Sequence, residues 1–207
     1  TNAISQVIGQ VKSQLKENDL MIVFDTKGDY YDQFFKQGDY VICNDSSRFG
    51  GVQDYWNIFS EITLDDSYQS IVESALEISA NLFADKIKKS NSPFFPQAAK
   101  DIFANILKIA ATSFDKELQN NQDLIEYFEL AGRKEIQQLF DVHNENRMNS
   151  YISNEAASQA EGVLSELNQL LSEIFVGDFR KVGNLSIRDL VRKKGGKTVF
   201  LEYDITV

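Results

Sequence analysis

The sequence is short of the side chains that bind soft metals or form disulfides. Its 207 residues include one cysteine, Cys43, and one histidine, His143. A lone cysteine cannot form an internal disulfide, and this pair is too few for a zinc site built on soft ligands. A catalytic Cys–His pair is conceivable, although a single residue of either kind is more often structural. We therefore assign no metal site and no disulfide framework.

Long apolar runs are also missing. No stretch approaches the roughly 18 uninterrupted apolar residues of a membrane-spanning helix. The first residues lack the basic and apolar regions of a signal peptide. With 43% hydrophobic and 12% aromatic residues, the chain can instead bury a sizeable core. We expect a globular chain that does not insert directly into a membrane.

Positive charge is scarce. The chain has 21 lysines and arginines against 31 aspartates and glutamates, a formal net charge of −10. Such a surface repels phosphate backbones, so any contact with nucleic acid must be local. The one basic stretch, near the C-terminus, comprises Arg180, Lys181, Arg188, Arg192, Lys193, Lys194 and Lys197. It is either a solvated helix face and turn, or a patch that meets DNA or an acidic neighbour.

The usual phosphate-binding loop is missing too. The chain contains no Gly-x-x-x-x-Gly-Lys-[Ser/Thr] sequence, whose backbone N–H groups and lysine hold the phosphates in many ATPases. It also contains no apolar strand that ends in paired Asp-Glu to hold magnesium. The nearest candidate, "FLEYD", is expected to place Glu202 in mid-strand. By itself the chain should therefore not hydrolyse ATP.

The two ends of the chain show an α/β pattern. Apolar residues spaced by three and four predict an amphipathic helix over 3–17. Continuous apolar runs predict strands buried on both faces, as in a parallel sheet. The predicted strands are 20–25, 39–44 and 197–203. A short helix over 187–194, capped by Ser186, precedes the last strand.

The middle of the chain is predicted to be helical throughout. The expected helices follow a cap at Asp65 or Asp66, follow Pro93 and Pro96, and span 121–131, 134–142 and 154–176. The apolar stripe on the last helix is either a coiled-coil seam or the core face of a bundle helix, and its short length favours the bundle. No strand is predicted between residues 65 and 176.

These patterns predict a mixed fold, in which a mostly α-helical domain is inserted into a partial α/β parallel sheet. The predicted domains are 1–64, 65–178 and 179–207, of which the first and last share the sheet. Because this sheet lacks its remaining strands, we expect the chain to be part of a longer protein.

Four stretches together resemble one family. They are "IVFDTKGDYYDQF" at 22–34, "GDYVICNDSSRFGGVQDYWNIFSEI" at 38–62, "SPFFPQAAKDIFANIL" at 92–107 and "LSIRDLVRKKGGKTVFLEY" at 185–203. In this order and spacing they are similar to the type IV coupling proteins. These are RecA-like ATPases that feed DNA and protein cargo into conjugation and type IV secretion channels.

The match to the family motifs is partial. The family's Asp-Pro-Lys-Gly-Glu takes the form Asp25-Thr26-Lys27-Gly28-Asp29 here. The family also has an Asn-Pro-Phe-Asp-type turn with a downstream Arg, Trp and Glu, which is matched by Asn44, Asp45, Arg48, Trp56 and Glu61. The sequence departs from this pattern where "DSS" replaces Pro and Phe, and where Gly50-Gly51 is inserted.

The resemblance implies a RecA-like sheet, and ATP and Mg²⁺ bound by the intact parent rather than by this chain. The strand that ends at Asp25 would lie beside the phosphate-loop strand, so Asp25, Lys27 and Gly28 are candidate cofactor-binding residues. Thr1 is either the hydroxyl that ligates Mg²⁺ or a residue foreign to the native protein. The alternative for Asp25 and Lys27 is a strand cap with a salt bridge in the turn.

Two further residues have competing interpretations. In the manner of the family, Arg48 could reach the nucleotide of a neighbouring subunit as an arginine finger, but a local role is more common. Trp56 is more often a core aromatic than a stacking platform for a ligand. No catalytic residue is assigned in this chain.

The resemblance also implies partners. In the family, the helical insertion is an all-α domain on the cytoplasmic end of a hexameric ring, implicated in receiving relaxosome and secreted effector proteins. Expected partners are therefore protein cargo, other ring subunits and, through the parent motor, DNA. The expected location is cytoplasmic, within an inner-membrane-anchored parent. An acidic helical surface suits basic protein partners, although such charge also serves solubility alone.

Two rival hypotheses remain at this stage. The chain could be a stand-alone helical protein-interaction module without nucleotide chemistry. It could also be a nucleotide-binding enzyme that uses Asp25 as a ribose acid, which would need a glycine-rich turn that the chain lacks. A glycine-rich phosphate loop just upstream in the parent gene would favour the coupling protein.

Overall fold

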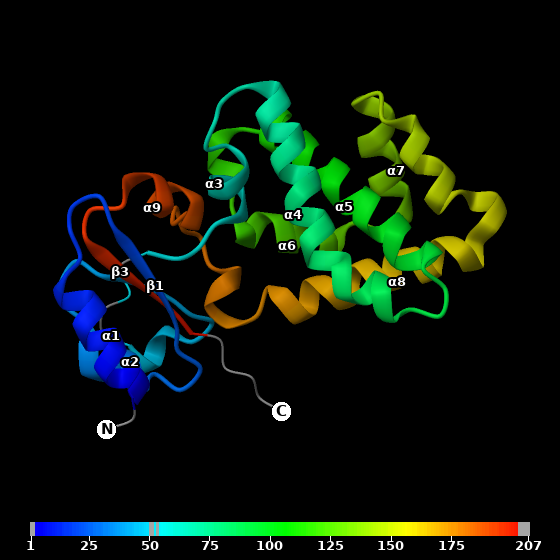
Figure 1. Ribbon diagram of the computed structural model, residues 1–207. Coiled ribbons are helices and arrows are strands. Elements are labelled where there is room, and N and C mark those ends of the chain that lie inside the picture. The colour runs from blue at the N-terminus through cyan, green and yellow to red at the C-terminus, as the bar shows by residue number, and fades with distance from the viewer. Residues whose placement is uncertain (1–2, 50–51, 53, 203–207) are drawn as a thin grey trace.

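The computed structural model describes residues 3–49, 52 and 54–202 (Figure 1). The helices are α1 (Ala3–Ser13), α2 (Asp29–Phe34), α3 (Ile58–Ile62), α4 (Tyr68–Lys89), α5 (Phe94–Ser113), α6 (Asn121–Leu130), α7 (Arg133–Val142), α8 (Ala157–Ile174) and α9 (Ile187–Lys193). Short 3₁₀ helices are η1 (Ser46–Arg48), η2 (Lys116–Leu118), η3 (Asn146–Ile152), η4 (Asn154–Ala156) and η5 (Gly177–Arg180). In Figure 1 a small α/β region with α1, α2 and α9 lies at the left, and the helical block α4–α8 lies at the right.

The strands β1 (Leu20–Phe24), β2 (Tyr40–Ile42) and β3 (Lys197–Leu201) form one parallel sheet in the order β1-β3-β2. A strand from late in the sequence therefore lies between two early strands. This confirms the predicted mixed fold, a mostly helical chain with a partial parallel sheet that its two ends build together. The division into domains at 64/65 and 178/179 stays a prediction.

Helices cover the two faces of the sheet unequally. On one face α1 packs Ile8 against Phe200, and α2 lies beside it. On the other face α9 packs Leu190 against Val199. At the edge of that second face Phe24 of β1 is 78% exposed. The prediction of burial on both faces is therefore wrong for β1, because no helix in the described ranges covers the end of this edge strand.

The first helix is shorter than predicted and turned differently. It ends at Ser13, before the predicted residue 17. Ile4 and Val11, which were expected on the buried side, are exposed, whereas Lys12 is buried. The orientation follows from the ion pair of Lys12 with Asp39, which can form only if this face of the helix points inward.

This ion pair lies between α1 and the sheet. Lys12 Nζ donates to Asp39 Oδ2 and to Thr198 Oγ1, both at 2.6 Å. Asp39 also accepts the backbone N–H groups of Lys36 and Thr198 at 2.8 and 2.9 Å. The side chains of Lys12 and Asp39 are only 6% and 5% exposed. One carboxylate thus joins α1, the turn before β2, and β3.

The largest hydrophobic core lies inside the helical block. Its central helix α5 packs against α4 and α8. Residues 65–176 are all described and form helices and turns without a strand, as predicted. On α8, Ala160, Val163 and Leu167 are fully buried in this core, which confirms the bundle interpretation. The face of α8 that the 3–4 spacing predicted to be apolar is therefore the face that packs against the other helices.

Two helix starts differ from prediction. Ser67, rather than Asp65 or Asp66, caps α4, and its Oγ accepts the N–H of Ser70 at 3.1 Å. Pro96 lies inside the first turn of α5 instead of before it. A proline is tolerated there because the first-turn N–H groups of a helix lack intrahelical partners anyway.

Buried polar side chains join the helical block to the α/β region. The Glu61 carboxylate of α3 accepts the Trp56 Nε1–H at 3.0 Å, the Ser186 hydroxyl at 2.9 Å and the N–H groups of Ile187 and Arg188. It therefore caps the N-terminus of α9 from another element. A carboxylate in this position also interacts favourably with the helix dipole.

Asn121, at the start of α6, makes a second link. Its side chain is fully buried and accepts the N–H of Ile58 at 2.9 Å. It donates to the carbonyl oxygens of Trp56 and Phe179 at 2.8 and 2.9 Å. Every polar atom of this amide has a partner, so the start of α6 is fixed against both segments that connect the helical block to the sheet.

Candidate functional site

Polar side chains gather at the carboxyl ends of the three strands, the edge at which open parallel sheets bind ligands. Asp25 follows β1, Asn44 lies just beyond β2, and Glu202 follows β3. Asp25 and Glu202 are only 2% and 3% exposed. The expectation that Glu202 lies in mid-strand is wrong, because β3 ends at Leu201. The backbone N–H of Glu202, just after the strand, donates a hydrogen bond to the carbonyl oxygen of Ile42 at 2.8 Å.

Three of the predicted cofactor-binding residues lie in one turn. Asp25 Oδ2 accepts the N–H of Tyr31 at 2.7 Å and so caps α2. Gly28 has φ of 78°, a left-handed conformation that favours glycine, and a Cβ there would lie 3.2 Å from the ring of Phe49. Lys27 is exposed and forms no ion pair with Asp25 in the part of the chain that the structure describes. The fourth predicted residue, Thr1, lies outside the described residues.

Arg48 reaches across this turn. Its Nη1 lies 3.1 Å from Glu202 Oε1, and its Nη2 donates to the carbonyl oxygen of Lys27 at 3.3 Å. The guanidinium therefore joins the end of β3 to the turn after β1. This geometry favours the local role, since an arginine finger would first have to leave Glu202. This role of Glu202 was not predicted, although an acid directly after an apolar strand is the same sequence pattern that marks Asp25.

The turn after β2 is held by the segment that leaves the helical block. Asp178 of η5 accepts the N–H of Ser46 at 2.5 Å, and its own N–H donates to Asn44 O at 2.8 Å. Gly177 has φ of 53°, and a Cβ there would lie 2.0 Å from Asn44 O, so only glycine fits. Burial disfavours the charged form of Asp178, but hydrogen bonds from Lys181 and Ser46 outweigh it and hold its pKa below the ordinary value.

The single cysteine is buried in a small hydrophobic cluster with Val41 and Phe49. Burial, with a contribution from the charge of Asp178, raises the pKa of the Cys43 thiol to about 11. At neutral pH the thiol stays protonated and unreactive. His143 directly follows α7, and Figure 1 shows α7 in the helical block, away from the strands β1 and β3 of the sheet to which β2 belongs. The structure therefore rules out the Cys–His pair.

An apolar cleft of about 490 Å³ opens beside the strand ends. Its walls include Phe24, Ile42, Trp56, Phe179 and Leu201. The Trp56 ring stacks on Phe175 at a centroid distance of 6.2 Å, and its N–H is held by Glu61. These contacts are those of a core aromatic, as predicted.

The strand-end edge does not fit ATP phosphates by itself. Its buried charged groups are the carboxylates Asp25, Asp178 and Glu202, and the nearby guanidinium of Arg48 already contacts Glu202. Such a set repels a triphosphate. Across the described ranges, no three His, Cys, Asp or Glu side chains converge on a point that could hold a metal ion.

We accordingly expect calorimetric titration of the 207-residue chain with Mg-ATP to show no binding tighter than about millimolar, a free energy of about −4 kcal/mol or weaker. The physical reason is the missing phosphate loop together with the acidic strand-end edge. A circular dichroism spectrum of the same sample controls for folding. Micromolar binding would contradict this account.

The basic stretch near the C-terminus is largely neutralised within the chain. The ion pairs are Arg180–Glu129, Lys181–Asp178, Arg188–Glu77, Arg192–Asp65 and Lys193–Asp189. The Arg192–Asp65 pair is bidentate, with N···O distances of 2.8 and 2.6 Å. Three of these pairs reach from α9 or η5 to acids at the helical block. The geometry therefore favours an internal role for this stretch over a patch for DNA.

None of the helices within the described ranges is both long and apolar enough to span a membrane. Comparison with curated proteins gives no significant match. Solved structures share the fold, among them the following two. The bacterial conjugative coupling protein TrwBdeltaN70, in a trigonal form with sulphate, superimposes with a TM-score of 0.67 at 16% identity over 96% of this chain. Its unbound monoclinic form superimposes with a TM-score of 0.68 at 15% identity over 97% of this chain.

The chain spans 42% of the length of each of these two structures. Among family models, the one described as the type IV secretion-system coupling protein DNA-binding domain matches residues 1–206. This match favours the coupling-protein hypothesis over a stand-alone helical module. The sheet shared by the two chain ends, the helical block between them and the match over almost every residue lead to one conclusion. The chain belongs to the family of type IV secretion-system coupling proteins.

Proposed function

We propose that the helical block recognises protein cargo, either relaxosome or secreted proteins, for an ATPase that translocates DNA and protein in conjugation or type IV secretion. The observation that carries this proposal is the distribution of charge. Residues 65–176 contain 18 acidic and 9 basic side chains, whereas the rest of the chain contains 13 and 12. Almost all of the net negative charge thus belongs to the helical block, where it can steer basic protein partners.

The remaining proposals concern the intact parent. We propose a cytoplasmic ring of subunits, hexameric and anchored in the inner membrane, that binds ATP and Mg²⁺ through residues outside this chain. DNA would meet the parent motor, as the family description of a DNA-binding domain suggests. The acidic helical block is unsuited to hold a phosphate backbone. Asp25, Lys27 and Gly28 would shape the edge of the motor sheet next to the nucleotide.

The contacts between the two regions support this division. The helical block connects to the sheet through residues of low exposure, among them Glu61, Asn121 and Asp178. Buried hydrogen-bonded networks of this kind favour a single arrangement of the parts they join. We propose that cargo bound to the helices is thereby held in a fixed position relative to the motor sheet.

Two matched sets of charge reversals in the intact parent test the proposal. The first set replaces Glu117, Glu126 and Glu135, on η2, α6 and α7, by lysine. The second set replaces Glu155, Glu161 and Glu166, on η4 and α8, by lysine. None of these six acids pairs with a cation in the part of the chain that the structure describes. We expect at least one set to weaken cargo capture by about tenfold or more with an unchanged ATPase rate.

A third variant of the parent supplies the opposite pattern. Asp25→Ala removes the cap of α2 at the strand-end edge, so we expect it to lower the ATPase rate more than cargo capture. If both triple variants capture cargo like the wild type, the helical block is not the recognition element. If Asp25→Ala leaves both assays unchanged, the assignment of the strand ends to the motor is wrong.

A further inference from the structure

An apolar groove opens on the helical block between α3, α5, η2, α6 and α7. Its cavity measures about 240 Å³. The walls are almost entirely hydrophobic and include Ile106, Phe114, Leu124 and Leu139. At the mouth, Leu118 is 49% exposed and Leu130 is 84% exposed. Two large aliphatic side chains therefore face solvent beside a cavity that is already lined by apolar groups.

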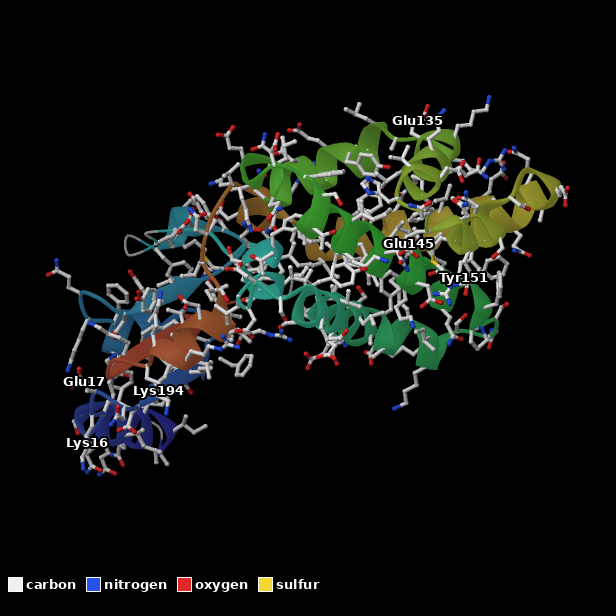
Figure 2. The ribbon with its side chains drawn as sticks, turned by 90° about the horizontal axis from the view of Figure 1, so that it is seen from above. Lys16, Glu17, Glu135, Glu145, Tyr151 and Lys194 are labelled. Carbon is white, nitrogen blue, oxygen red and sulfur yellow. The ribbon has the colours of Figure 1, made fainter. Side chains whose placement is uncertain are left out.

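The border of this groove is acidic. Asp123 and Glu126 are among its lining residues, and no lysine or arginine of the described chain lines it. Glu135 lies one turn before the lining residue Leu139 on the same face of α7. Burial, with a smaller contribution from the charge of Glu135, raises the pKa of the lining residue Tyr127 to about 12. Figure 2 shows Glu135 at the end of the molecule remote from Lys16 and Lys194, which lie beside the sheet.

Like several other acids of the helical block, Glu126 and Glu135 have no counter-ion among the described residues. Acids nearer the sheet, such as Asp65, Glu77 and Glu129, form ion pairs with α9 or η5. No described cation pairs with Glu126 or Glu135. Glu126 receives only the Gln122 amide, at 2.8 Å. The negative potential is therefore uncompensated where the apolar groove opens.

The groove also contains an unsatisfied polar group. The Tyr127 hydroxyl is buried and has no hydrogen-bond partner among the described residues. Buried polar groups without a partner are uncommon in folded proteins.

We propose that this groove is the docking site for a basic amphipathic helix of a protein partner. Leucine-like side chains of that helix would enter between α5 and α6, and its lysines or arginines would meet Glu126 and Glu135. This is the helix-in-groove mode of recognition. The inference deepens the proposed function, on which it rests, by naming the surface and the chemistry of the cargo segment.

Other occupants fit less well. The cavity is smaller than the ~300–1,000 Å³ of a typical small-molecule site, so it suits inserted side chains better than a whole ligand. Nucleic acids and anionic membranes are repelled by the acidic border. A second copy of this chain would offer its basic stretch, but most of that stretch is already paired with acids of its own chain.

Fluorescence anisotropy with a designed peptide tests the proposal on the 207-residue chain. The probe is a labelled helix of about five turns, with leucines at i, i+3, i+4 and i+7 and lysines at most other positions. Two control peptides have the same length: one replaces lysine by glutamate, and one scrambles the leucines so that they share no face. We expect the lysine probe to bind in about the micromolar range, and the control peptides to bind at least about tenfold more weakly.

Matched variants locate the binding surface. Glu126→Lys and Leu130→Gln should each weaken binding of the lysine probe by about tenfold. Glu161→Lys on α8 and Leu76→Gln on α4, where Leu76 is half-exposed, make the same kinds of change outside the groove. Both should leave binding of the lysine probe unchanged. Circular dichroism verifies that all four variants fold. If the groove and control variants weaken binding equally, or if the lysine probe does not bind, the groove is not the docking site.

The charge reversals in the intact parent separate this inference from the function on which it rests. If the groove is the docking site, the triple variant on η2, α6 and α7 should lose cargo capture. The triple variant on η4 and α8 should keep it. The reverse result would overturn the groove and leave cargo recognition by the helical block intact. Full capture by both sets would overturn both.

Discussion

Replacing Asp39 by alanine should lower the free energy of unfolding by about 3–5 kcal/mol, the cost of leaving one charge of a buried ion pair without its partner. The Lys12 ammonium would remain in a site where its side chain is 6% exposed. Two backbone N–H groups, of Lys36 and Thr198, would also lose their acceptor. Urea denaturation followed by circular dichroism measures the change.

Two further variants separate charge from packing. Adding Lys12→Met to Asp39→Ala removes the uncompensated ammonium, so the double variant should regain part of the lost stability. Asp85→Ala breaks the exposed Lys89–Asp85 pair on α4, whose side chains are 75% and 80% exposed, and should leave the urea midpoint unchanged. If Asp39→Ala were as mild as Asp85→Ala, the buried pair would not hold α1 on the sheet.

Glu61→Ala should cost about 3 kcal/mol of stability, because four donors lose one buried acceptor. These donors are the Trp56 ring, the Ser186 hydroxyl and the N–H groups of Ile187 and Arg188. The N-terminus of α9 would lose its cap, and the α/β region would lose a direct link to α3. The stability loss should therefore be accompanied by loosening of the junction.

Trp56 is the single tryptophan of the chain, so its emission reports on the junction directly. We expect a red shift in Glu61→Ala, since the ring loses the contact that holds it against Phe175. Glu61→Gln keeps one acceptor oxygen and should lie between the wild type and Glu61→Ala. Glu73→Ala, an exposed glutamate on α4, is the matched control. Wild-type emission and urea midpoint in Glu61→Ala would show that the carboxylate does not organise the junction.

Much of the fold was predictable because it follows from local chemistry. Apolar runs located the three strands, and 3–4 spacing located the core face of α8 at Ala160, Val163 and Leu167. Ser186 was correctly predicted as the cap of α9. A serine just before the first helical residues can accept a hydrogen bond from a backbone N–H of the first turn. These features depend on residues near one another in the sequence.

The errors have a common physical origin in long-range contacts. The orientation of α1 depends on Lys12 meeting Asp39, which no spacing within the helix reveals. Exposure of Phe24 depends on which helices cover the sheet, and the position of Glu202 depends on where the pairing of β3 stops. The groove on the helical block is likewise a property of five elements together, α3, α5, η2, α6 and α7, since none of its walls differs locally from an ordinary core face.

By itself the sequence determined the class of protein: a mixed chain with an acidic helical middle and no phosphate loop, similar to the coupling proteins. The tertiary structure alone decided which charges are neutralised and which stay open to a partner. Ion pairing depends on distances between side chains far apart in the sequence. The basic stretch near the C-terminus is thus mostly paired with acids within the chain. No described cation pairs with Glu126 at the apolar groove, or with Glu135 one turn from the lining residue Leu139.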